Sequence, residues 1–290
     1  MHLSPYLELF TNSKGVIYLF THINKNKMEK RELKYIYGPV FSWRMGMSLG
    51  IDPITAKEKI CNYDCVYCQL GRTTKFYTER EDFIPVEDIM TEIRSLPPMQ
   101  IDYYTFSGRG EPTLAKNLGA MITAVRQATD GKIAVITNAA LIDEEGVQDD
   151  LMRADYVLAK LDACDDHSMG VVDIPAQGLS FQKTVNGIKA FKKKFQGRLA
   201  LQIMFIEENK QYAPAIAKIA RKINADEVQI NTPLRPSGVR PLSEEDLDEI
   251  KRHFEGLPAV TVYESERRDV QPFDEKQTIL RHGNFKKKHK

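Results

Sequence analysis

Cys61-Asn62-Tyr63-Asp64-Cys65-Val66-Tyr67-Cys68 is the most informative segment of the chain. It holds three of the four cysteines, spaced Cys-x3-Cys-x2-Cys, with an aromatic residue directly before the third. Thiolates are strong, soft ligands for iron, and three on one short loop can hold three corners of an iron–sulfur cubane. A structural zinc site normally has four Cys or His ligands, whereas the next candidates here are the distant Cys164, His22 and His167. The spacing therefore predicts a 4Fe-4S cluster with one iron open to another molecule.

The composition is that of an ordinary globular protein. Of 290 residues, 42% are hydrophobic and 28% charged, and 41 Lys plus Arg nearly balance 40 Asp plus Glu. Such a chain can bury a large core and gives no global signal for nucleic acid. It contains no apolar run of membrane-helix length and no secretory pattern at the N-terminus. Cysteines committed to a metal loop fit a reducing compartment, so we expect a cytoplasmic protein with neither a membrane nor DNA as partner.

Short apolar runs alternate with helical periodicity along most of the chain. The predicted strands are 48–54, 101–106, 132–137, 155–161, 198–205, 227–231 and 259–263. Between them, apolar residues recur at helical spacing, as in Ile89, Met90 and Ile93, and Asp143 and Ser243 are expected to cap two of the helices. Strict alternation with short loops predicts parallel strands joined by right-handed crossovers.

A second motif, Phe106-Ser107-Gly108-Arg109-Gly110-Glu111-Pro112-Thr113, follows a predicted strand. Its glycines allow the backbone to approach a ligand closely, and its carboxylate can accept from an ammonium group. Together with the cysteine triplet, Tyr37-Gly38-Pro39-Val40, Ser48-Leu49-Gly50-Ile51-Asp52 and Cys68-Gln69-Leu70-Gly71-Arg72-Thr73, it resembles the radical S-adenosylmethionine (SAM) superfamily. Within it, the chain resembles a subgroup related to the wyosine-tRNA base synthases, from about Tyr37 to about Gly283.

The resemblance implies two cofactors and their ligands. Cys61, Cys65 and Cys68 would hold a 4Fe-4S cluster whose open iron takes the amino and carboxylate groups of SAM. One electron from the cluster would cleave SAM to methionine and a 5′-deoxyadenosyl radical, which removes hydrogen from a substrate. In such enzymes the cofactor carries the hard chemistry and the protein orients it.

The resemblance also implies residues that bind SAM. The segment 107–112 resembles the Gly-Gly-Glu-Pro motif that holds the SAM amino group, with Arg109 in place of the first glycine. Tyr67 would lie near the adenine, and Asn138 would contact the ribose. We expect the cofactor-binding set to be Tyr67, Ser107, Gly108, Gly110, Glu111, Asn138 and Gln202. Asn62 and Gln69 are candidate hydrogen-bond donors to cluster sulfurs.

The fold implied by the resemblance is α/β, a partial (β/α)6 barrel with a C-terminal extra strand. Barrel chemistry lies at the carboxyl ends of the strands. Lys160 and Asp162 end one predicted strand and share a face, so they are our catalytic candidates for binding substrate or the SAM carboxylate; a simple salt bridge is the alternative. Arg235 could engage an anionic substrate. Cys164 is expected to be a packed thiol or a hydrogen-atom donor.

The chain is expected to divide into three parts. Residues 1–36 would form an N-terminal hairpin and basic linker, 37–265 the barrel, and 266–290 a C-terminal extension with a basic tail. The wyosine synthases carry a second cluster upstream of the triplet, and residues 1–36 contain no cysteine to hold one.

The substrate stays open at this stage. RNA, in the form of a tRNA base, and a small molecule are both candidates, and a small electron donor, flavodoxin or ferredoxin, is the expected partner. The alternatives are an activase that makes a radical on a partner protein, and a non-catalytic iron–sulfur or zinc redox module. A flat basic rim would favour RNA, and a closed small cavity would favour a metabolite.

Overall fold

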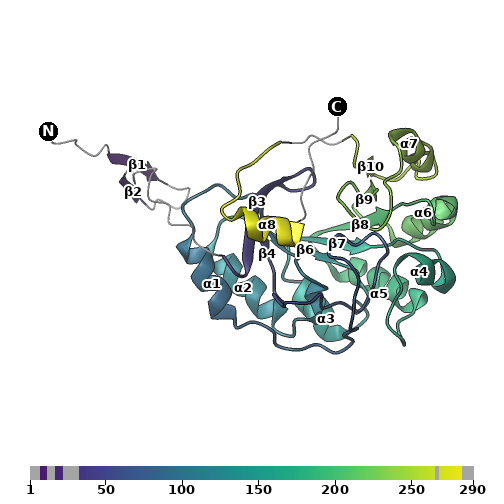
Figure 1. Cartoon of the computed structure of the whole chain (residues 1–290), viewed down its shortest axis with the longest axis horizontal. Helices are drawn as coiled ribbons and strands as arrows, with labels where there is room; N and C mark the ends of the chain where they lie inside the picture. The colour runs from purple at the N-terminus through teal and green to yellow at the C-terminus, as the bar shows by residue number, and fades with distance from the viewer. Residues whose placement is uncertain (1–6, 12–16, 22–32, 265–267, 283–290) are drawn as a thin grey trace. The chain divides into compact units, whose positions relative to one another are not determined.

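The computed structural model describes residues 7–11, 17–21, 33–264 and 268–282 (Figure 1). The chain divides into two units, Met1–Glu32 and Leu33–Lys290. In the first, β1 (Leu7–Thr11) pairs antiparallel with β2 (Ile17–Thr21), as the hairpin prediction required. The turn between these strands, the basic linker and the basic C-terminal tail lie outside the described residues.

The second unit is built on one open sheet of eight strands, in the spatial order β10-β9-β8-β7-β6-β5-β4-β3. All neighbouring pairs are parallel except β3 with β4, which is antiparallel. The strands are β3 (Ile36–Ser42), β4 (Gly46–Ile51), β5 (Tyr103–Phe106), β6 (Lys132–Thr137), β7 (Tyr156–Lys160), β8 (Arg198–Met204), β9 (Glu227–Asn231) and β10 (Ala259–Thr261). The order has two free edges, so the predicted partial barrel with an extra strand is confirmed.

Helices connect the parallel strands and pack on the outer face of the curved sheet (Figure 1). They are α1 (Val86–Ser95), α2 (Leu118–Ala128), α3 (Glu145–Leu151), α4 (Asp166–Val172), α5 (Phe181–Lys194), α6 (Ala213–Ile223), α7 (Glu244–Arg252) and α8 (Glu275–His282), with 3-10 turns at Pro112–Leu114 and Lys210–Tyr212. The last helix, α8, packs instead against β3.

Burial explains why these segments take these forms. β7 reads Tyr-Val-Leu-Ala-Lys and buries its first four side chains, as expected of a strand covered on both faces. α6 buries Ala213, Ile216, Ala217, Ala220 and Ile223, the spacing of one helical face, and ends at Asn224 in the left-handed conformation. A second, smaller core cluster, which includes Met45, Ala134 and Leu158, lies inside the sheet and forms the floor of the barrel.

Several details differ from the sequence-based expectations. The first barrel strand is Gly46–Ile51, not 48–54, because Asp52 leaves the sheet to accept hydrogen bonds from the backbone of Ile54 and Thr55. Ser243 caps α7 as predicted, but α3 begins after Glu144, so the prediction of Asp143 as its cap was wrong. β3, α4 and α8 had not been anticipated. Within the described residues, no helix has the length and apolarity needed to cross a bilayer.

Candidate functional site

A cavity of about 1080 Å³ opens on the inner face of the sheet. Its floor includes Met45 and Ile136, and its wall continues through the carboxyl ends of the central strands. Polar side chains contributed by three of these strands or the loops after them are Ser107, Gln202, Asn231 and Arg235. The cysteine loop contributes Tyr67 and Gln69. This cavity therefore lies where the fold predicts chemistry.

The cysteine loop, which carries Cys61, Cys65 and Cys68, follows the carboxyl end of β4 and is folded around Asp64. The Asp64 carboxylate accepts from the backbone N–H of Thr73 at 2.6 Å and pairs with Arg72 at 2.6 Å and with Lys59 at 3.9 Å. Asp64 and Lys59 are buried. Because this carboxylate lies between the first and second cysteines of the triplet, it fixes the curvature of the loop on which the thiols lie.

The three thiols lie close together, and the surroundings of Cys61 and Cys65 favour the neutral form. Burial raises the pKa of Cys61 to about 12, and burial with Asp173 raises the pKa of Cys65 well above its usual range. A thiol that coordinates iron is deprotonated outright. A bound cluster would therefore offset the free-energy cost of ionising these buried thiols. The side chains are near enough to shift one another's pKa, but within the described residues no three Cys, His, Asp or Glu side chains converge on a common metal position.

The donors around Cys61 differ from those expected. Its sulfur accepts from the Tyr63 backbone N–H at 3.4 Å and from Asn138 Nδ2 at 3.8 Å. Asn62 instead accepts from Asn138 Nδ2 at 2.6 Å, and its own Nδ2 is buried with no partner in the part of the chain that the structure describes. A buried amide donor left over beside a cluster ligand suits an inorganic sulfide or a SAM oxygen, because unpaired buried donors are costly.

The segment 107–112, which carries Glu111 and is called the glutamate loop below, packs against the cysteine loop at two glycines. A Cβ on Gly110 would lie 1.7 Å from the carbonyl oxygen of Ile60, and one on Gly108, where φ is +154°, would lie 2.4 Å from the Asp52 carboxyl carbon. The Glu111 N–H donates to the same Ile60 oxygen at 3.0 Å. The glycines are therefore explained by contact between the two loops as well as by the predicted approach to a ligand.

Glu111 is buried, and its carboxylate is already satisfied by protein donors. It accepts from Thr113 N and Oγ1, from Thr137 Oγ1 at 2.6 Å and from Asn138 N at 2.7 Å. Burial raises the pKa of Glu111, and these four hydrogen bonds oppose that shift. The carboxylate thus joins the end of β5 to the end of β6, while its contact with the SAM amino group stays a prediction.

Lys160 and Asp162 are brought together as predicted, in a network that reaches the large cavity through Tyr67 but whose Lys160 and Asp162 do not line it. Lys160 Nζ lies 2.8 Å from Asp162 Oδ2, which also accepts a short hydrogen bond from the Tyr67 hydroxyl. The ammonium lies 4.3 Å from the centre of the Tyr67 ring. The salt-bridge alternative is therefore present in the structure, and the catalytic role of the pair stays a prediction.

The same network contains Asp173, which sequence reasoning missed. Asp173 Oδ1 accepts from Tyr67 OH at 3.1 Å and from Cys65 Sγ at 3.4 Å, and burial together with Asp162 raises its pKa to about 7. It follows α4, a helix that had not been predicted, so no strand end pointed to it. Its backbone oxygen accepts from Asp64 N at 3.0 Å, which ties the end of α4 to the cysteine loop.

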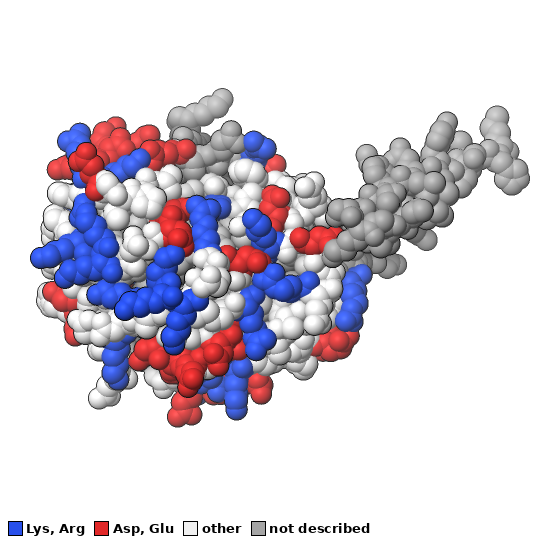
Figure 2. Space-filling model, turned by 180° about the vertical axis from the view of Figure 1, so that it is seen from behind, with Lys and Arg blue, Asp and Glu red and all other residues white. Residues whose placement is uncertain are grey.

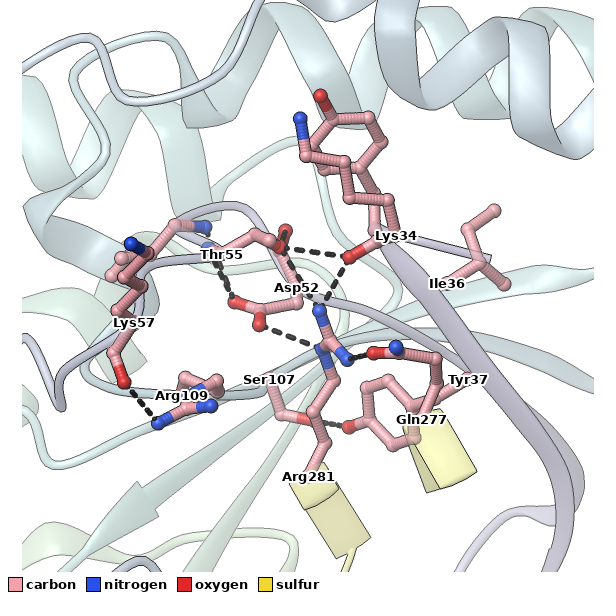
Figure 3. Close-up of polar contacts among 12 residues, drawn as sticks. Lys34, Ile36, Tyr37, Asp52, Thr55, Lys57, Ser107, Arg109, Gln277 and Arg281 are labelled. Atoms are coloured by element: carbon pink, nitrogen blue, oxygen red, sulfur yellow. Dashed lines mark hydrogen bonds and ion pairs between the residues drawn. The ribbon is translucent and has the colours of Figure 1, made fainter. Parts of the chain in front are cut away.

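The C-terminal helix α8 closes the side of the site beside β3. Arg281 reaches from α8 to Asp52 and to the backbone oxygen of Lys34 (Figure 3). Gln69 donates to the Arg281 backbone oxygen at 2.9 Å and accepts from Arg235 at 2.8 Å. Gln69 therefore connects α8 to the cavity wall, in contrast to the expected contact with a cluster sulfur. Ser107 Oγ lies 2.5 Å from the hydroxyl oxygen of Tyr37 on β3. This predicted SAM contact therefore also forms a hydrogen bond to β3.

The remaining candidates fall in different places. Gln202 lines the large cavity, as predicted for the SAM pocket, and Met204 lies beside it. Cys164 is half-buried, and its sulfur lies 3.6 Å from Ser168 Oγ at the start of α4, outside the lining of the large cavity.

Comparison with known proteins agrees with this geometry. The model of the Radical SAM superfamily matches residues 59–220. UPF0026 protein slr1464 of Synechocystis sp. (strain ATCC 27184 / PCC 6803 / Kazusa) is 38% identical over 211 residues, which cover 72% of this chain and 78% of that protein. GTPase Obg of Brachyspira hyodysenteriae (strain ATCC 49526 / WA1) is 36% identical over 249 residues, 83% of this chain but only 36% of that protein. The chain thus spans about a third of that longer relative.

A solved structure of TYW1 with a lysine-pyruvate adduct bound shares the fold, with a TM-score of 0.58 over 73% of this chain and 74% of that one, at 12% identity. The chain belongs to the radical SAM superfamily, which uses a 4Fe-4S cluster and SAM. The donor set fits both: three thiols on one loop, an unpaired amide beside them, and a cavity next to the loop.

Proposed function

We propose that the protein is an enzyme that cleaves SAM reductively and uses the resulting 5′-deoxyadenosyl radical to abstract hydrogen from a small molecule bound in the cavity. The observation that carries this proposal is the position of the cavity beside the cysteine loop, with Tyr67 contributing to both. Ligand pockets usually measure about 300–1,000 Å³, so 1080 Å³ accommodates SAM together with a second small molecule.

The cluster, once bound, would supply the electron that breaks the carbon–sulfur bond of SAM. The chain's own residues would position the cluster and SAM and shield them from water. The loop fixed by Asp64 would present the three thiols, and the docked segment Gly108–Gly110 would offer backbone groups to the methionine part of SAM. Tyr67, buried over the Lys160 ammonium, would exclude water from one side. An external one-electron donor, flavodoxin or ferredoxin, would complete the cycle.

Surface charge supports a small substrate over RNA. On the face shown in Figure 2, basic and acidic side chains are interspersed rather than segregated, and the cavity rim carries both signs, with Glu244, Arg268 and Asp269. A nucleic-acid site would be expected to present a continuous basic surface. A tRNA base and a residue of a partner protein are the competing substrates, and tRNA or protein can be added to the same assay.

The test begins with anaerobic reconstitution of the full chain with iron and sulfide, reduction by dithionite, and addition of SAM. We expect about four irons per chain and formation of 5′-deoxyadenosine. Cys61→Ala, Cys65→Ala and Cys68→Ala should each abolish SAM cleavage. Cys164→Ala is the matched control, because this fourth cysteine lies outside the loop and should leave cleavage unchanged.

Two results would overturn the proposal. Bound zinc, or a cluster that does not react with SAM, would leave a redox module. Stimulation of 5′-deoxyadenosine formation by bulk tRNA, but not by a pool of cellular small molecules, would move the substrate to RNA. Stimulation by the small-molecule fraction alone would support the assignment.

A further inference from the structure

The cavity has a cationic wall that the proposed radical chemistry does not use. Arg44 lies in the turn between β3 and β4, before the amino end of β4, whereas the cysteine loop leaves the carboxyl end of the same strand. Arg235 follows β9, and Gln229 of the same strand lies 3.4 Å from Arg44 Nη1. Both arginines line the cavity. Two guanidinium groups thus border the same space.

The charge on Arg44 has no compensating carboxylate in contact with it among the described residues. Its Nη1 lies 3.4 Å from the neutral Gln229 Oε1, and its guanidinium lies 5.1 Å from the centre of the Trp43 ring. Its Nε is buried with no hydrogen-bond partner. Burial lowers the pKa of Arg44 and the charge of Glu227 opposes this shift, but Glu227 is already paired with Arg198 and accepts from Gln229.

The two guanidiniums affect one another. Burial and then the charge of Arg44 lower the pKa of Arg235 to about 10, and burial lowers the pKa of Arg44 to about 10. Both groups therefore stay protonated at neutral pH, at a cost in self-repulsion and lost hydration. Asn231 is buried in the wall of the same cavity, and its Nδ2 has no hydrogen-bond partner among the described residues.

These observations describe a site suited to an anion. The Arg44 side chain lines the cavity with no carboxylate in contact among the described residues, and a guanidinium binds a planar oxyanion through parallel hydrogen bonds. Asn231 lines the same cavity and adds an amide, and a second cation adds attraction without contact.

We propose that Arg44, with Asn231 and the charge of Arg235, binds a carboxylate or phosphate group of the substrate. This inference rests on the proposed function and names the class of its substrate: a small organic anion. The site anchors the charged group of the substrate, and the binding energy there orients the reacting carbon.

Binding of simple anions to the full, cluster-reconstituted chain tests the proposal without SAM or reductant. The probes are inorganic phosphate and acetate, titrated at constant ionic strength and followed by thermal shift and equilibrium dialysis. We expect saturable binding of one probe, weakened at least tenfold in Arg44→Gln and in Asn231→Asp. Preference for phosphate indicates a phosphorylated substrate, and preference for acetate indicates a carboxylic acid. Arg94→Gln, the same change on α1 at a side chain 57% exposed, should bind like the wild type.

Arg44→Gln also separates a binding role from a structural one. Since Arg44 is a desolvated charge without a carboxylate partner, its replacement should keep or raise the melting temperature. A destabilised Arg44→Gln protein that still binds the anion would overturn the proposal, as would binding that Arg94→Gln weakens equally, or no binding of either probe. SAM cleavage without anion binding would refute this inference alone, and anion binding without SAM cleavage would refute the proposed function alone.

Discussion

Arg281 Nε donates to Asp52 Oδ2 at 2.8 Å across 229 positions of sequence, and both side chains are only 1% exposed (Figure 3). Asp52 ends β4 and begins the cysteine loop, and its other oxygen accepts from Ile54 and Thr55 backbone N–H groups. Gly108 of the glutamate loop packs against the same carboxyl group. One buried ion pair therefore holds α8, the cysteine loop and the glutamate loop together.

Replacing Arg281 should be strongly destabilising. Arg281→Gln leaves Asp52 buried without its counter-charge, which typically costs about 3–5 kcal/mol. Arg94→Gln, at an exposed ion pair with Glu87, should cost less than about 1 kcal/mol. Urea denaturation of the two variants measures both values. Equal losses would show that the Arg281–Asp52 pair adds nothing beyond a surface contact.

Gly110 should not tolerate a side chain. In Gly110→Ala the new Cβ meets the Ile60 carbonyl oxygen, a backbone atom that cannot swing aside, so the two loops must separate. We expect a loss of about 1–3 kcal/mol and poor retention of iron after reconstitution. Gly170→Ala on α4 is the control, because no atom lies within 4 Å of its Cβ, and it should be neutral or stabilising by up to about 1 kcal/mol. Full iron loading of Gly110→Ala would contradict this account of loop docking.

Replacing Asp64 should weaken iron retention more than replacing its exposed partner Arg72. Asp64→Asn removes the counter-charge of Lys59, whose side chain is 5% exposed, and weakens the bond from Thr73. Arg72→Gln removes a partner that is 75% exposed and should change little. The rate of iron loss to a chelator should therefore rise in Asp64→Asn and stay near the wild-type value in Arg72→Gln. The reverse order would mean that the surface pair, not the buried lysine, sets the loop.

His282 should make stability fall as the pH is lowered. Burial, then Arg235 and Arg44, lower its pKa to about 2, and its Nε2 faces Arg235 Nη2 at 2.6 Å, which requires that nitrogen to accept. The folded state excludes a proton that the unfolded chain takes up below its ordinary pKa of about 6.5. Stability contributed by neutral His282 is therefore complete above that value and is lost below it, by about 2 kcal/mol at most between pH 7 and 5.

Denaturation curves at pH 7, 6 and 5 for the wild type and His282→Gln measure this contribution. The variant should be less sensitive to pH over that interval by the stated amount. Parallel pH profiles would show that His282 is protonated in the folded protein, contrary to its contact with Arg235.

Much of the site could be predicted from the sequence because its signals are local. Three thiols within eight residues are held near one another by chain length alone, and the strand boundaries at 132–137 and 227–231 follow from runs of buried residues. Lys160 and Asp162 were placed together because a strand repeats every two residues. Glu111 was expected to face a ligand. Two of its four hydrogen-bond donors belong to the nearby Thr113, but the other two belong to Thr137 and Asn138 at the end of β6, which pattern alone does not bring close.

Hydrophobic periodicity and short ligand spacing act over a few residues, so the alternating strands and helices and the cysteine loop could be predicted from the sequence. Their surroundings depend on tertiary packing. Asp173 joins the site through an unpredicted helix, Arg281 reaches Asp52 from the far end of the chain, and Arg44 has no carboxylate in contact among the described residues. Pairings of this kind depend on long-range packing, in which a charge finds its partner, or lacks one, only when distant segments meet.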